Sequence, residues 1–134
     1  MIIDARGAVL GRFASKVAKE LLNGESIIIV NAEKVVVTGN VNAIMDRFKE
    51  KRQRGDRNKG PFFPRYPDRI LRRTIRGMLP YKKEKGEKAF KRLRIFMGNP
   101  DNLKGEKMGK TSEDLKCKFM TLGQISKRLG AKIE

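Results

Sequence analysis

Histidine is absent from this sequence, and its 134 residues include a single cysteine, Cys117. Without histidine, the chain lacks the side chain used most often for general acid–base catalysis near neutral pH and the commonest zinc ligand. One cysteine alone forms neither an internal disulfide nor a structural zinc site, and a serine or cysteine hydrolase would lack its base. An enzyme that uses only Asp, Glu, Lys or Arg, such as a small nucleotide-using enzyme, stays open on composition. We nevertheless expect no catalytic residues, no metal site, no cofactor and no small-molecule substrate.

Long hydrophobic runs are also missing, since no apolar stretch approaches the roughly 20 residues that span a bilayer. The N-terminal residues MIIDARG have neither the basic start nor the apolar stretch of a signal peptide. An unpaired thiol is typical of a reducing compartment, so we expect a cytoplasmic chain with no membrane partner. Hydrophobic residues make up 39% of the sequence and fall in distinct runs, which predicts one folded domain over residues 1–134.

Positive charge is distributed very unevenly along the chain. Lys and Arg number 32 against 15 Asp and Glu, a net charge of +17. Residues 47–94 hold 19 of the basic residues and 5 of the acidic ones, so that segment carries +14. A field this concentrated repels itself and favours binding to a polyanion. Aromatic residues, prolines and glycines are interspersed through it, which indicates a surface shaped to a partner.

Hydrophobic periodicity in the first half predicts alternating strands and helices. A short strand at Ile2–Ile3 precedes a helix over about residues 10–22, whose apolar residues recur every three or four positions. Residues 26–30 and 35–37 are apolar and β-branched, and we expect the first of these strands to be buried on both faces. Asn40 is placed to cap a second helix. This alternation predicts an α/β fold with a largely parallel sheet.

The second half is less regular. Residues 49–66 have no sustained periodicity and are rich in Arg, Lys, Gly and Pro, which predicts a basic loop. Asp68 is expected to cap a third helix. The inward-facing residues of that helix should be Ile70, Leu71, Thr74, Ile75 and Met78. The remaining expected elements are a basic connector at 79–88, a helix at 89–93, a core strand at 95–97, a polar loop at 101–118 and a small helix at 122–129.

Three interpretations of the basic region remain open on residues alone: a solvated surface, a membrane-binding surface and a nucleic-acid-binding surface. Abundant arginine favours nucleic acid over a solvated surface, and a membrane site would want a basic amphipathic helix with large apolar anchors. No helix-turn-helix, zinc finger or basic zipper is visible, which favours RNA over duplex DNA. Phe62, Phe63 and Tyr66 either stack on bases or pack the loop onto the domain. The turn from Gly7 to Gly11 lacks phosphate-loop spacing, and close helix–strand packing explains it better.

A set of motifs over about residues 1–100 carries a resemblance to a known family. The motifs are LGR-x-AS at Leu10–Ser15, VNAEKV at Val30–Val35, TGN at Thr38–Asn40, GP-F-x-P-R at Gly60–Arg65 and TIRGMLP at Thr74–Pro80, followed by Gly86. The motifs occur in the same order as in one family, and the chain resembles the universal ribosomal protein thirteen of the large subunit, in its archaeal form. The resemblance implies a three-layer α/β/α domain with a small, mostly parallel sheet and a basic loop extension. It leaves the role of the C-terminal extension, residues 101–134, open.

The same resemblance implies a structural role in the large ribosomal subunit and no enzymatic activity. The implied partners are large-subunit ribosomal RNA and neighbouring ribosomal proteins, and the implied role is subunit assembly in translation. A free RNA-binding regulator or RNA chaperone of the same fold is the alternative. The RNA-binding residues carried over from the family are Lys49, Lys51, Arg52, Arg54, Arg57, Lys59, Arg65, Arg69, Arg72, Arg73, Arg76, Lys82, Lys83 and Lys85. We expect the guanidinium groups of Arg72, Arg73 and Arg76 to project away from the core.

Overall fold

The computed structural model describes residues 1–53, 64–99, 102–107 and 118–131; the side chain of Arg52 lies outside that description. The elements in chain order are β1 (Ile2–Asp4), α1 (Leu10–Leu22), β2 (Ile27–Val30), the 3-10 turn η1 (Ala32–Lys34), β3 (Val36–Thr38), α2 (Val41–Gln53), α3 (Pro67–Met78), α4 (Glu84–Lys91), β4 (Leu93–Ile95), β5 (Glu106–Lys107), β6 (Phe119–Thr121) and α5 (Leu122–Arg128).

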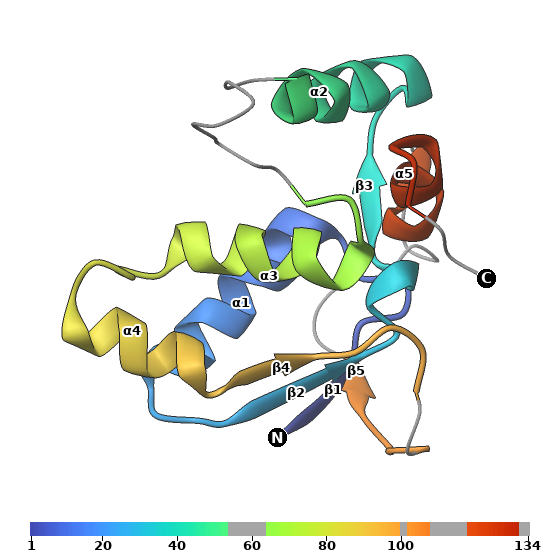
Figure 1. Ribbon diagram of the computed structural model, residues 1–134. Coiled ribbons are helices and arrows are strands. Elements are labelled where there is room, and N and C mark those ends of the chain that lie inside the picture. The colour runs from blue at the N-terminus through green and yellow to red at the C-terminus, as the bar shows by residue number, and fades with distance from the viewer. Residues whose placement is uncertain (54–63, 100–101, 108–117, 132–134) are drawn as a thin grey trace.

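Four short strands form the larger sheet, in the order β4-β2-β1-β5. Each neighbouring pair in it is parallel. Helices α1, α3 and α4 lie on the same side of this sheet (Figure 1), and α1 contacts both of the others. The arrangement confirms the predicted α/β class with its small, mostly parallel sheet.

Helix α1 covers the sheet with the face that the periodicity predicts. Its buried residues are Phe13, Ala14, Val17, Ala18 and Leu21. The turn before it contains Gly7 at a φ of 73°, in the left-handed region that glycine adopts at little cost. This dihedral angle explains Gly7, but Gly11 is exposed and a Cβ there would meet nothing within 4 Å, so the expected close packing is wrong at Gly11.

Strand β2 is internal to the sheet but is not fully buried. Ile27 and Ile29 are inaccessible to solvent, whereas Ile28 is half-buried. Successive side chains of a strand point to opposite faces, so Ile28 lies on the face away from the Ile27 and Ile29 side chains. The prediction that this strand is buried on both faces is therefore wrong at Ile28.

Strand β3 lies outside the larger sheet. It pairs antiparallel with β6, so that Val36 lies opposite Thr121, and the two form a sheet of their own.

The C-terminal extension thus contributes to the fold: Leu122 and Ile125 of α5 are fully buried in the core cluster. The predicted small terminal helix is confirmed. The predicted polar loop at 101–118 is wrong at Glu106–Lys107, which form β5 beside β1.

Helix α2 begins where the sequence predicts but continues five residues into the expected loop. The Asn40 Oδ1 atom accepts a hydrogen bond of 2.8 Å from the Asn42 main-chain N–H, as a capping side chain should. The helix then runs to Gln53, so the expected basic loop does not begin at Lys49. Hydrophobic periodicity did not predict residues 49–53 as helix, because Lys, Glu, Arg and Gln favour a helix by propensity and give it no apolar face there.

Helix α3 differs from the prediction in its first residues and in the burial of Met78. Tyr66 precedes it, Pro67 is its first residue, and Asp68 lies inside the first turn, so Asp68 is not the cap. A proline at this position has no N–H to leave unsatisfied and has its φ already helical. Ile70, Leu71 and Ile75 are fully buried as expected, but the Met78 side chain is 41% exposed.

Helix α4 occupies part of the segment predicted as a connector, and the following strand lies two residues earlier than predicted. Pairs of Glu and Lys at i,i+4 support the helix, with Glu84 2.9 Å from Lys88. Gly86 is buried against the preceding turn, where a Cβ atom would collide with the carbonyl oxygen of Pro80. Only glycine fits this approach without moving the backbone.

Candidate nucleic-acid interface

The predicted RNA-binding residues fall into three groups in the structure. Arg54, Arg57 and Lys59 lie outside the described residues, as do Phe62 and Phe63, and the Arg52 side chain is likewise undescribed. The residues on or before helices α2 and α3 are Lys49, Lys51, Arg65, Arg69, Arg72, Arg73 and Arg76. The last group is Lys82 and Lys83, in the turn before α4, and Lys85 on α4.

Four arginines line one side of helix α3. Arg69, Arg72, Arg73 and Arg76 are spaced at i, i+3, i+4 and i+7, which places them on one face of a helix. Ile70, Leu71 and Ile75 fall on the other face and are buried, so they fix the orientation of the helix. Burial of the apolar face therefore turns the arginine face outward.

These arginines surround a shallow hollow of about 320 Å³, which we call the α3 hollow. Its lining residues are Pro64, Arg69, Arg72, Arg73, Arg76 and Phe90. Guanidinium groups bind phosphate through two parallel hydrogen bonds and stack on flat rings. Four of them around one concavity match the backbone of a nucleic acid better than they match any neutral ligand.

Two of the four arginines are oriented by aromatic rings. The Arg76 guanidinium carbon lies 4.3 Å from the centre of the Tyr81 ring, and that of Arg72 lies 4.2 Å from the centre of the Phe90 ring. Stacking of this kind restricts the side chain and does not itself occupy the in-plane N–H groups. The hollow is thus partly organised before any ligand binds.

Arg72 also has a role within the fold. Its Nη1 donates a hydrogen bond of 3.0 Å to the carbonyl oxygen of Leu93, and the side chain is half-buried. The expectation that Arg72 projects away from the core is therefore wrong, because its guanidinium is held between Phe90 and strand β4. Arg76 is exposed, as expected, and Arg73 is half-buried.

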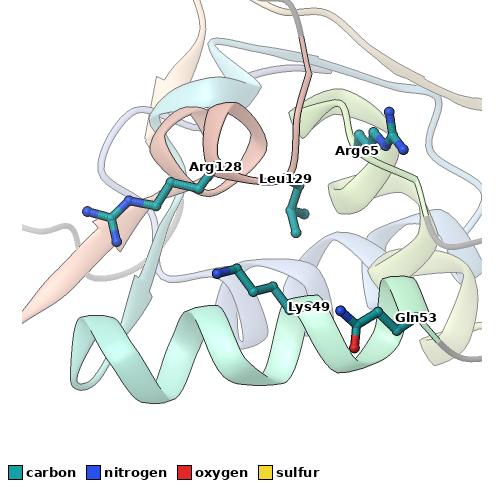
Figure 2. Close-up of a pocket in the computed structure, with 5 residues that line it drawn as sticks. All are labelled: Lys49, Gln53, Arg65, Arg128 and Leu129. Carbon is teal, nitrogen blue, oxygen red and sulfur yellow. The ribbon is translucent and has the colours of Figure 1, made fainter.

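A second hollow, of about 440 Å³, lies between α2, the segment before α3 and the end of α5 (Figure 2). We call it the α5 hollow. Its lining residues are Lys49, Gln53, Arg65, Arg128 and Leu129. Lys49 and Arg65 were predicted as RNA-binding residues, but Arg128 was not. The adjacent cations Lys127 and Arg128 at the end of a predicted helix were the available signal.

The other predicted residues line neither hollow. Lys51 is exposed on α2, with its Nζ atom 5.4 Å from the centre of the Phe48 ring. Lys82, Lys83 and Lys85 are exposed around the start of α4. Tyr66, whose ring was expected to stack or to pack, is 39% exposed.

Two further observations concern metal ligands and membrane spans in the part of the chain that the structure describes. That part contains no group of three or more His, Cys, Asp or Glu side chains able to hold a metal ion. None of its helices is long and apolar enough to cross a membrane.

Comparison with known proteins identifies the family. The family model described as ribosomal protein L13 matches residues 1–102. The chain belongs to the ribosomal protein L13 family. The match includes both segments that meet in the α3 hollow, Pro64–Arg76 and Phe90, but ends before α5.

Archaeal members of this family are similar over almost the whole chain. Large ribosomal subunit protein uL13 of Methanocaldococcus jannaschii is 54% identical, over 98% of this chain and 98% of its own length. The protein of the same name from Archaeoglobus fulgidus is 50% identical, over 96% of this chain and 86% of its own length. The protein of the same name from Haloarcula marismortui is 46% identical, over 98% of this chain and 91% of its own length. The similarity to these relatives therefore extends beyond residue 102 into the C-terminal extension.

Proposed function

We propose that this chain is a structural component of the large ribosomal subunit, that it binds large-subunit ribosomal RNA, and that it supports subunit assembly in translation. Membership of the ribosomal protein L13 family supports this role, as do relatives named large ribosomal subunit protein uL13. In this role the chain is not an enzyme. It works in the cytoplasm as part of the ribosome.

The arginine face of α3 is the observation that carries RNA binding. Four guanidinium groups surround one hollow, and the opposite face of the helix is fixed in the core. Phosphate groups would neutralise charges that otherwise repel one another, and this neutralisation releases counterions from the RNA. The rigid α/β layer would hold the cations in place, so that little ordering is required on binding.

We propose the following RNA-binding residues: Lys49, Lys51, Arg52, Arg54, Arg57, Lys59, Arg65, Arg69, Arg72, Arg73, Arg76, Lys82, Lys83 and Lys85. Lys82, Lys83 and Lys85 do not line the α3 hollow, but Arg76 stacks on Tyr81, which precedes Lys82, so the two groups would meet neighbouring stretches of RNA. The exposed surface away from these cations would be available to neighbouring ribosomal proteins.

We also propose that residues 1–134 act as a single domain. Burial of Leu122 and Ile125 against the core and pairing of β6 with β3 support this, because removal of the extension would expose both. The extension would then be a structural part of the domain and not a separate tail.

Sedimentation of a cell extract tests the proposed role against a free RNA-binding regulator or chaperone. A subunit component co-migrates with large subunits and stays there after a moderate-salt wash. A regulator would sediment mainly in lighter fractions. A chain found away from large subunits after the wash would refute the structural role.

A further inference from the structure

The α5 hollow brings together three segments that are far apart in sequence. Lys49 and Gln53 come from the last turns of α2, Arg65 from the segment before α3, and Arg128 and Leu129 from the end of α5. In Figure 2, Lys49 extends from α2 toward α5 and Leu129 points back toward α2. Arg65 and Arg128 lie on opposite sides of the hollow with their guanidinium groups turned outward, so each would rotate inward to reach a ligand between them. Three cations from three segments therefore border one concavity.

The hollow has no acidic lining among the residues that the structure describes. Within the same residues, Lys49, Arg65 and Arg128 are all exposed, and none is in an ion pair. Like charges at the rim of one concavity favour an anion between them. Gln53 adds an amide that can donate a hydrogen bond to the same ligand.

Arg128 is carried by a well-fixed helix. The Thr121 hydroxyl accepts from the Gln124 main-chain N–H at 3.2 Å, and the Gln124 side chain accepts from the Thr121 N–H, which forms a capping box. Gly130, at a φ of 100°, ends the helix beside Arg65: the Arg65 Nη1 atom is 3.8 Å from the position a Cβ of Gly130 would occupy. The packed helix thus fixes the backbone from which Arg128 projects and places its end next to Arg65.

The two hollows are neighbours along the chain. Pro64 lines the α3 hollow and Arg65 lines the α5 hollow, so the segment before α3 separates them. A polyanion that occupies the α3 hollow therefore needs to pass only this segment to reach the second set of cations. An extended RNA strand has phosphates at regular intervals that suit such a path.

We infer that the α5 hollow binds a phosphodiester group of the RNA, with Arg65 and Arg128 donating hydrogen bonds and Lys49 supplying a third charge. The inference rests on the proposed function and extends it to the C-terminal helix, beyond the residues that the family model covers. Leu129 provides an apolar floor against which a ribose packs. The alternative ligand for these three cations is an acidic segment of a neighbouring protein.

The test measures binding of the full chain to protein-free large-subunit RNA from archaeal ribosomes over a series of KCl concentrations. We expect Arg128→Gln to weaken binding roughly three- to tenfold, and replacement of all three cations in Lys49→Gln/Arg65→Gln/Arg128→Gln to reduce the magnitude of the log–log salt slope by about 0.7 to 0.9, as loss of one phosphate contact should. Lys88→Gln is the control, because it changes the net charge equally at an exposed site where Lys88 already pairs with Glu84. Both variants should keep the thermal unfolding transition of the parent.

A double-variant comparison tests whether Lys49 and Arg128 hold the same group. If they share one phosphate, the combined loss in Lys49→Gln/Arg128→Gln is smaller than the product of the two single losses. Lys49→Gln/Arg76→Gln, with one change in each hollow, should give the full product. A salt slope unchanged by the triple variant, as expected if the hollow instead takes an acidic protein segment, would overturn the inference, and so would full multiplicative loss in the first pair. Failure of the parent chain to bind the RNA would refute the proposed function itself.

Discussion

Arg72 is the residue at which binding and folding are coupled most directly. Its guanidinium stacks on Phe90 and donates to the Leu93 carbonyl oxygen. Strand β4 is at the edge of the sheet, and the neighbouring Arg92 carbonyl already accepts from Ile27 in β2. Carbonyl groups alternate in direction along a strand, so the Leu93 oxygen points away from β2 and the sheet leaves it unpaired. Arg72 satisfies this acceptor.

The cost of Arg72→Gln follows from these two contacts. A partly buried cation–π contact is worth about 1 kcal/mol, and a hydrogen bond of this kind contributes about 1 kcal/mol net. Glutamine is too short to keep both contacts, so we expect a loss of about 2 kcal/mol in the free energy of unfolding. For a chain of this length that loss lowers the melting temperature by about 6–8 °C.

Thermal unfolding monitored by circular dichroism measures the effect, with Arg76→Gln as the matched control. Arg76 also stacks on a ring, that of Tyr81, but both side chains are exposed. Its replacement should therefore lower the melting temperature by less than about 3 °C, since an exposed cation–π contact is worth about 0.5 kcal/mol. Both variants should bind ribosomal RNA more weakly. Equal melting temperatures for the two variants would show that the Phe90 and Leu93 contacts add nothing to stability.

Three other predictions concern the core and the charge. Gly86→Ala should lower the free energy of unfolding by about 2 kcal/mol or more, because the new Cβ meets a main-chain carbonyl. Gly77→Ala, on an exposed helix face with open space around it, should leave that free energy unchanged or raise it by up to about 1 kcal/mol. Equal denaturant midpoints for the two variants would contradict this. Ile29→Asp should abolish the cooperative transition, whereas Ile28→Asp, at a half-buried site, should retain one at lower temperature. Binding to RNA should depend on salt with a log–log slope of about −4 or steeper, as about six phosphate contacts require, and a slope near −1 would mean that most of the basic region never meets phosphate.

The sequence alone determined the parts of this protein that depend on local pattern. The apolar spacing in α1 predicted both the helix and its buried face, because a period of 3.6 places those residues on one side wherever the helix packs. The excess of positive charge in residues 47–94 indicated a polyanionic partner, because charge that concentrated repels itself in any fold. The spacing of Arg69, Arg72, Arg73 and Arg76 at i, i+3, i+4 and i+7 already predicted that they share one face of α3.

The tertiary structure decided what depends on partners distant in sequence. Nothing in the Val36–Thr38 segment indicates pairing with Phe119–Thr121, because main-chain hydrogen bonds carry no side-chain signature. Arg72 could not be separated from Arg76 by sequence, since the difference lies in Phe90 and Leu93 being brought to one of them by packing. Arg128 and Lys49 line the same hollow only because α5 is buried against the core, and burial of that helix is a property of the whole fold.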